Sequence, residues 1–251
     1  MSRQARVRSK TGIYHVMLRG INQQQIFEES LDYDKFLVVL KEIKKICDYK
    51  LCAYCLMGNH IHLLIKEEEV PVGQVMKKIA SRFAYWYNIK YRRVGHLFQD
   101  RFKSEPVEDD KYLLTVVRYI HQNPVKAGIC KSVKDYEYSS YQEYTGNSNI
   151  VDTELIYEYI SKAEFEEYSN IENSDKCLDI ESEITIRLTD EQAHKLISKY
   201  TKCKNVTEFQ SLDEEIKKKA IQKMHKGGAS IRQISRLSGV TKGIVEKWLK
   251  C

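Results

Sequence analysis

Between residues 13 and 124, strand-like and helix-like segments alternate in an order that few folds can accommodate. Strands show as short apolar or β-branched runs, and helices as apolar residues that recur every three to four positions. The dipeptide Gly58-Asn59 separates two strand-like runs, as in a tight hairpin. The predicted strands cover 13–18, 51–57, 60–66 and 102–108, and the predicted helices cover 31–50, 72–91 and 109–124. The order β-α-β-β-α-β-α predicts an α+β fold, a ferredoxin-like (RRM-like) split βαβ sheet with helices on one face.

A second, all-helical module is predicted near the C-terminus. Its helices are expected over 214–226, 231–237 and 241–250. Ser230 and Thr241 are suited to cap the last two helices, and Gly239 is suited to the turn between them. Two short helices around a glycine turn resemble a helix-turn-helix, whose second helix would carry Lys242 and Lys247.

The formal net charge of +6 is unevenly distributed along the chain. Lys and Arg outnumber Asp and Glu by 24 to 17 over residues 1–150 and by 12 to 5 over 201–251, whereas 151–200 holds 5 against 13. Two basic blocks predict two modules that face a polyanion, although a spread of lysines is often only a solvated surface. The predicted domains are a first module over 1–145, an acidic connector with some helix over 146–212, and a DNA-binding module over 213–251.

Several classes of protein are excluded by composition. No apolar run approaches the ~20 residues that span a bilayer, and no signal-peptide stretch follows the basic N-terminus. The number of cysteines, seven, is odd and their positions are scattered, which favours reduced thiols over a disulfide framework: Cys47, Cys52, Cys55, Cys130, Cys177, Cys203 and Cys251. We therefore expect a soluble, intracellular chain that makes no use of a membrane.

His60 and His62 are separated by one residue on a predicted strand, so both imidazoles point to the same face. This geometry suits two ligands of one metal ion. Two histidines alone are weak evidence for a metal site, and the alternative is a pair of buried histidines that are hydrogen-bonded within the protein. Cys52 and Cys55 have ligand-like spacing. Their separation of three positions on a strand directs them to opposite faces, which argues against a zinc site shared with the histidines.

The segment 118–128 carries the second candidate group. Tyr119 and Asn123 are four residues apart near the end of a helix, which Pro124 is predicted to terminate, so they share one face. A tyrosine and a carboxamide aimed at a metal-bearing strand would suit phosphoryl transfer. The phenol, with an ordinary pKa of about 10, would need a metal that polarises the phosphate. A packed aromatic side chain is the alternative, because the chain has 17 tyrosines.

The run MGNHIHLL at 57–64 resembles the HUH motif of single-tyrosine transposases, which mobilise small bacterial insertion sequences. Among them, the REP-associated tyrosine transposases resemble this chain most. Three further stretches resemble the same family: YHVMLRG at 14–20, GHLFQDRFKS at 95–104 and YIHQNPVKAG at 119–128. Their order and spacing extend the resemblance over residues 11–145, and joint agreement of four motifs is far more specific than any single one.

The resemblance implies a chemistry for these residues. His60 and His62 would hold a divalent metal, Mg²⁺ or Mn²⁺, and Tyr119 would attack DNA to give a 5′-phosphotyrosine link and a free 3′-OH. Asn123 falls where the family places a third, carboxamide-type ligand, although some relatives carry Gln there. Gly58 stands where many relatives have Pro, and either residue suits a tight turn.

The expected partner is single-stranded DNA with hairpin-forming or repeat ends. Basic and aromatic residues interleave between 82 and 103, as in proteins that track phosphates and stack on unpaired bases, although Phe83 and Trp86 are assigned to a core stripe. Contacts with DNA are predicted for Arg92, Arg93, Arg101, Lys103, Lys242 and Lys247.

The leading hypothesis is thus a DNA strand transferase of the HUH type, working in the cytoplasm at the nucleoid. A domesticated DNA-binding regulator without cleavage is the alternative from another class. A rolling-circle replication initiator shares the chemistry, but no helicase-type phosphate loop follows in the sequence. Whether the protein is a monomer or a homodimer stays open.

Overall fold

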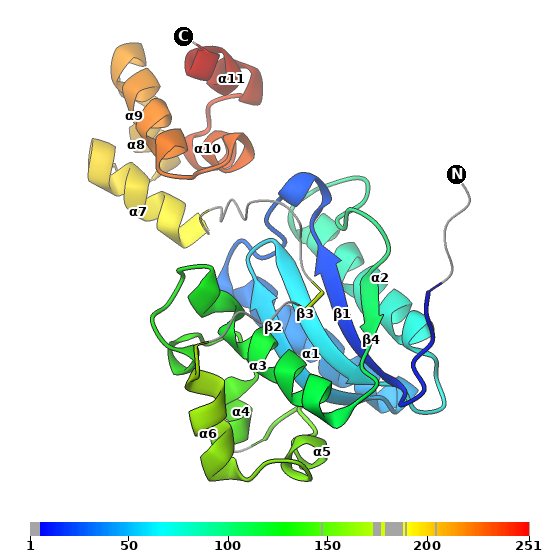
Figure 1. Cartoon of the computed structure of the whole chain (residues 1–251). Helices are drawn as coiled ribbons and strands as arrows, with labels where there is room; N and C mark the ends of the chain where they lie inside the picture. The colour runs from blue at the N-terminus through cyan, green and yellow to red at the C-terminus, as the bar shows by residue number, and fades with distance from the viewer. Residues whose placement is uncertain are drawn as a thin grey trace. The chain divides into compact units, whose positions relative to one another are not determined.

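The chain is described by a computed structural model (Figure 1). The structure describes residues 6–146, 148–172, 177–178, 188, 190–203 and 205–250. It forms two compact units, residues 1–26 with 31–184 and residues 27–30 with 185–251. The domain boundaries expected at 145 and 212 remain a prediction. Six cysteines are free thiols, while Cys251 lies outside the described residues.

The first unit is built on one four-stranded sheet. Its strands are β1 (Ile13–Arg19), β2 (Lys50–Met57), β3 (His60–Lys66) and β4 (Lys103–Pro106). They pair antiparallel in the order β2-β3-β1-β4, the order that a split βαβ arrangement gives. Gly58 and Asn59 connect β2 to β3, which confirms the predicted hairpin.

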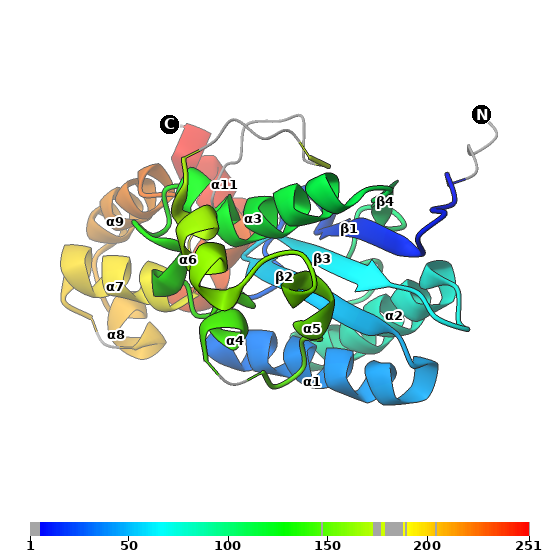
Figure 2. The same cartoon turned by 60° about the horizontal axis from the view of Figure 1, so that its bottom comes forward.

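Helices cover both faces of this sheet (Figure 2). α1 (Ser30–Cys47) and α2 (Val72–Lys90) lie on one face, and α3 (Asp110–Lys126) lies on the other. The expectation that all helices share one face is therefore wrong for α3. β2 and β3 are the physical reason, because nearly every residue of both strands is buried and a sheet buried on both faces needs a cover on each.

α3 carries the two candidate residues of the C-terminal motif. It begins after Asp109, whose side chain caps the first turn by accepting the backbone N–H of Tyr112 over 2.8 Å. The prediction that Pro124 ends the helix is wrong, since α3 continues to Lys126. The N–H of Ala127 still donates to the carbonyl of Asn123 over 2.9 Å, so the helical hydrogen bonding continues past the proline. Lys126 consequently stays on the helix.

The chain after α3 packs back onto it. This stretch contains η2 (Val133–Asp135), α4 (Tyr141–Thr145), α5 (Glu154–Tyr157) and α6 (Lys162–Asn170), and a further short helix, η1 (Ile21–Gln23), follows β1. Gln122 of α3 donates its side-chain amide to the carbonyls of Ser169 over 2.9 Å and Ile171 over 2.8 Å. The end of α6 is thereby fixed against α3.

The second unit contains α7 (Asp190–Thr201), α8 (Val206–Gln210), α9 (Glu214–Lys226), α10 (Ile231–Ser238) and α11 (Lys242–Lys250). The last three helices agree closely with the predicted ranges. Ser230 caps α10, and Gly239 takes a left-handed φ of 70° in a place where a Cβ would meet the side chain of Gln210. Its core includes Phe209, Ile221, Met224, Ile234 and Val245. In the described part of the chain, no helix is long and apolar enough to cross a membrane.

Candidate active site

His60 and His62 lie side by side on β3 and are fully buried. Nδ1 of His60 is 2.7 Å from Oδ1 of Asn59, whose amide nitrogen donates to the carbonyl of Gln23. Because Oδ1 can only accept, the proton of His60 belongs on Nδ1. This leaves the lone pair of Nε2 directed inward.

Asn123 of α3 lies between the two imidazoles. Its Oδ1 is 3.4 Å from Nε2 of His60, and its Nδ2 is 3.4 Å from Nε2 of His62. Burial, followed by the neighbouring imidazoles, holds the pKa of His62 well below its ordinary value. Two ring nitrogens and one carboxamide therefore converge from a strand and a helix.

Tyr119 lies on α3, one turn before Asn123. It forms one cluster with Asn123 and the two histidines of β3. Its side chain is buried, and its ring centroid lies 5.8 Å from that of His62. On the same helix, Nζ of Lys126 lies 4.9 Å from the centroid of the Tyr119 ring. The structure thus brings together the four residues that the sequence predicted for the site, namely His60, His62, Tyr119 and Asn123. It adds the ammonium group of Lys126, which sequence reasoning missed.

His15 of β1 is a further residue of the cluster that sequence reasoning missed. It is fully buried, and its Nε2 lies 2.9 Å from Nδ1 of His62. Its ring centroid is 5.9 Å from that of Tyr119. The signal in the sequence was a histidine inside a strand-like run, but its place beside His62 depends on the pairing of β1 with β3. That pairing is not local information.

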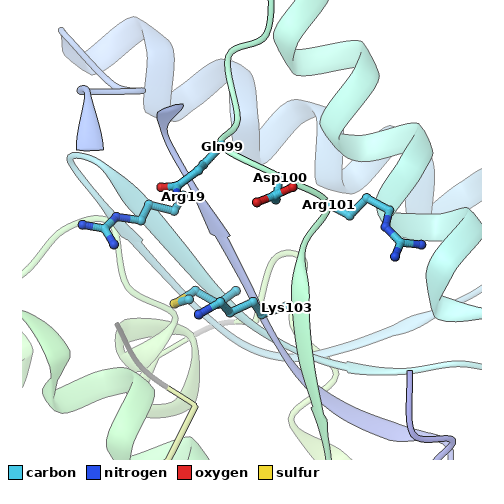
Figure 3. A pocket seen from close by; sticks show the side chains of 6 residues that line it. Arg19, Gln99, Asp100, Arg101 and Lys103 are labelled. Atoms are coloured by element: carbon cyan, nitrogen blue, oxygen red, sulfur yellow. The ribbon is translucent and has the colours of Figure 1, made fainter. Parts of the chain in front are cut away.

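A shallow basic hollow opens beside the cluster, between β1 and β4 (Figure 3). Met17 lines it and lies opposite both His62 and Lys103 in the strand register, so the hollow belongs to the face that carries the histidines. Its polar lining consists of Arg19, Gln99, Asp100, Arg101 and Lys103. Arg101 and Lys103 were predicted as DNA contacts, whereas Arg19 was missed because its position depends on strand pairing.

The other predicted DNA contacts lie elsewhere. Arg92 is exposed after α2, and Arg93 donates to the side chain of Gln24 over 3.1 Å; neither residue lines the hollow. Lys242 and Lys247 are exposed on α11 of the second unit. Their role in binding stays a prediction.

The donor set suits a divalent ion. Among the described residues, no three His, Cys, Asp or Glu side chains are arranged so that they alone could hold a metal ion. An ion held here would use the two Nε2 atoms and the amide oxygen of Asn123, with water or phosphate oxygens as further ligands. Cys52 and Cys55 are poor ligands, because burial raises the pKa of the Cys52 thiol to about 12 and that of Cys55 well above its ordinary value.

Comparisons with known proteins match part of this chain to one group of transposases. Residues 9–123 match the sequence profile of the family described as "Transposase IS200 like". A protein of Haemophilus influenzae is 28% identical over 154 residues, which cover 56% of this chain and 86% of that one. A protein of Escherichia coli K12 is 22% identical over 137 residues, 54% of this chain and 78% of its own. Both carry the name REP-associated tyrosine transposase, provisionally in the first case.

A solved structure is similar as well. It is that of a REP-associated tyrosine transposase bound to a REP hairpin, with a TM-score of 0.50 and 20% sequence identity. The likeness covers 57% of this chain and 84% of that one. At this identity, the likeness shows a shared fold.

Proposed function

We propose that this chain, whose residues 9–123 match the family of IS200-like transposases, cleaves and rejoins single-stranded DNA through Tyr119. One observation carries the proposal above the others: Tyr119 and Asn123 of α3 lie against His60 and His62 of β3 in one buried cluster. A tyrosine can act as the nucleophile of metal-assisted phosphoryl transfer, and two imidazoles with a carboxamide can hold the metal ion.

The proposed reaction begins with attack by Oη of Tyr119 on a backbone phosphorus. The new P–O bond forms as the bond to the 3′ oxygen breaks; the phenol loses its proton, and the departing 3′ oxygen gains one. The products are a 5′-phosphotyrosine and a free 3′-OH, and attack by a 3′-OH in the reverse sense rejoins the strand. A Mg²⁺ or Mn²⁺ ion held by His60, His62 and Asn123 would polarise the phosphate.

DNA with a hairpin beside an unpaired segment is the proposed substrate. The similar solved structure holds a REP hairpin, and the basic hollow at Arg19, Arg101 and Lys103 offers phosphate contacts beside the cluster. The decisive experiment incubates the protein with the DNA that flanks its own gene in Mg²⁺ or Mn²⁺. Mass spectrometry should find a nucleotide adduct on Tyr119. Intact DNA under all these conditions would favour the non-cleaving regulator instead.

The basic hollow should contribute to affinity for the DNA strand. We expect Arg101→Gln with Lys103→Gln to weaken binding of a hairpin-bearing oligonucleotide about tenfold and to lower the slope of log K against log salt by about 0.7 per lost phosphate contact. Fluorescence anisotropy at several salt concentrations measures both quantities. Lys77→Gln with Lys78→Gln, which removes two exposed charges from α2, is the matched control. Equal losses in the two double variants would argue against a specific role.

α10 and α11 are proposed to act as a helix-turn-helix that binds duplex DNA. Lys242 and Lys247 are exposed on α11, and nothing lies within 4 Å of a Cβ built at Gly243 between them, so this side of the helix is open. Lys242→Ala with Lys247→Ala should weaken duplex binding about tenfold in an electrophoretic shift assay and leave cleavage of a short single strand unchanged. Lys219→Ala, at an exposed position of α9, is the control. Unaltered duplex binding would instead favour a role in assembly.

His15 should hold His62 in the tautomer that ligation requires. For Nε2 of His62 to offer its lone pair, Nδ1 must carry the proton and donate it to Nε2 of His15, 2.9 Å away. We expect His15→Phe to weaken Mn²⁺ binding about 10- to 100-fold, and His15→Gln to retain more affinity because its amide oxygen can accept. Electron paramagnetic resonance of Mn²⁺ with the DNA-free protein measures this. Wild-type affinity in His15→Phe would refute the role.

A further inference from the structure

A second hollow lies beside the C-terminal end of α3, with a cavity volume of about 370 Å³. That volume is within the roughly 300–1,000 Å³ of pockets that bind small molecules. One wall is the last turns of α3 with the following loop to Val133, and the other is the end of α6. The hollow is distinct from the basic hollow between β1 and β4, with which it shares no lining residue.

The two walls are held together by a buried contact. Gln122 is only 7% exposed, and its amide donates to the carbonyls of Ser169 and Ile171 over 2.9 and 2.8 Å. A buried amide that makes two such bonds fixes the separation of the helices. The hollow is therefore a built feature of the fold.

Lys126 connects this hollow to the proposed nucleophile. The lysine lines the hollow, and its Nζ lies 4.9 Å from the centroid of the Tyr119 ring. Lys126 is thus shared between the lining of the hollow and the surroundings of the Tyr119 ring. Lys131 adds a second exposed cation to the lining, against the single carboxylate of Glu172.

The remaining lining suits a nucleobase. Val125 and Val133 supply apolar surface. Ser132 supplies a hydroxyl, and Asn170 supplies an amide whose nitrogen already donates to the carbonyl of Glu166 over 2.7 Å and whose oxygen can accept from the edge of a base. The hydroxyl of Ser169 is buried in the wall, and the structure records no hydrogen-bond partner for it among the described residues. None of the described lining residues is aromatic, but cations for a phosphate together with apolar surface and polar groups for the edge of a base match a nucleotide better than an inorganic anion.

We propose that this hollow binds one unpaired nucleotide of the DNA strand, immediately beside the phosphate that Tyr119 attacks. The inference rests on the proposed function and adds a specificity site to it. Lys126 and Lys131 hold the phosphate of that nucleotide, and Asn170 and Ser132 contact its base. The family match ends at residue 123, so the wall formed by α6 lies outside the matched segment.

Photocrosslinking tests the placement. A hairpin oligonucleotide from the DNA flanking the gene receives 5-iododeoxyuridine at each unpaired position in turn, and mass spectrometry locates the crosslinks. We expect one position next to the cleaved phosphate to crosslink to peptides containing 122–133 or 169–172. Crosslinks confined to other parts of the chain would overturn the inference. Crosslinking requires binding but not cleavage, so it reports on the hollow even if Tyr119 forms no adduct.

Variants test the contribution to the reaction. We expect Lys131→Gln with Asn170→Ala to raise KM for cleavage about tenfold with little change in kcat. An abasic nucleotide at the crosslinked position should raise the KM of the wild-type protein by a similar factor. The double variant with the abasic substrate should show no further rise in KM, because both changes remove the same contact. Lys111→Gln, exposed in the first turn of α3, is the control. A normal Tyr119 adduct with unchanged KM would refute the hollow and leave the proposed function standing. Absence of any adduct in the wild type would refute the proposed function.

Discussion

Tyr119→Phe is expected to abolish the covalent protein–DNA adduct, with a loss of cleavage of at least about 10³-fold. The substitution removes one oxygen and keeps the ring, so the contacts with His62 and His15 are retained. The fold and the affinity for DNA should therefore remain close to those of the wild type. Denaturing gel electrophoresis of the protein with a labelled hairpin oligonucleotide and Mn²⁺ measures the adduct directly.

Tyr112→Phe is the matched control for this experiment. Tyr112 lies on the same helix two turns earlier and is half-buried, outside the cluster of histidines. It should form the adduct at the wild-type rate. An adduct that persists in Tyr119→Phe would show that another residue is the nucleophile, and the assignment of the cluster would fail.

The second large effect is expected for the double variant His60→Ala with His62→Ala. Removing both imidazoles should eliminate cleavage that depends on Mg²⁺ or Mn²⁺ and lower Mn²⁺ binding below detection, because only Asn123 remains of the convergent donors. Binding of DNA should be largely intact, since the basic hollow is unchanged. Cleavage by the wild-type protein that continues in EDTA would contradict the metal role.

This double variant needs a test of folding. Both histidines are fully buried, and emptying such a site costs roughly 2–5 kcal/mol by analogy with large-to-small core substitutions. His60→Gln with His62→Gln fills more of the space and should lose cleavage equally. Circular dichroism confirms folding in both double variants. His194→Ala, at an exposed position of the second unit, is the control for removing an imidazole.

The local parts of the candidate site were predictable from sequence. The alternation of a strand places His60 and His62 on one face, and a spacing of four places Tyr119 and Asn123 on one side of a helix. The hairpin at Gly58-Asn59 and the three C-terminal helices also follow from turn and capping residues. In each case the signal is contained in fewer than about 15 consecutive residues, which is the scale on which periodicity acts.

The missing parts depend on which segments meet in space. His15 reaches His62 only because β1 pairs with β3, and Arg19 joins Lys103 in one hollow only because β4 pairs with β1. No local pattern encodes such pairings. The position of α3 on the second face has the same origin, since it follows from the burial of β2 and β3 on both sides.

Pro124 shows a different limit of sequence reasoning. Proline removes one backbone donor, which predicts the end of a helix, but the N–H of Ala127, three residues later, still donates to the carbonyl of Asn123. Because α3 persists to Lys126, this lysine remains in helical register with Tyr119 and reaches its ring. The error in one boundary therefore concealed the cation beside the proposed nucleophile.

The bonds from Gln122 to the end of α6 determine where a shorter recombinant version of the first unit can be cut. Truncation after residue 145 would keep Tyr119, the histidines and Asn123, yet it would remove the carbonyls of Ser169 and Ile171 from that amide. It would also remove the ring of Phe165, which lies 4.5 Å from that of Tyr144. The outer side of the helix that bears the nucleophile would then be open to water. A fragment intended for crystallisation or biochemistry should therefore extend at least to residue 172.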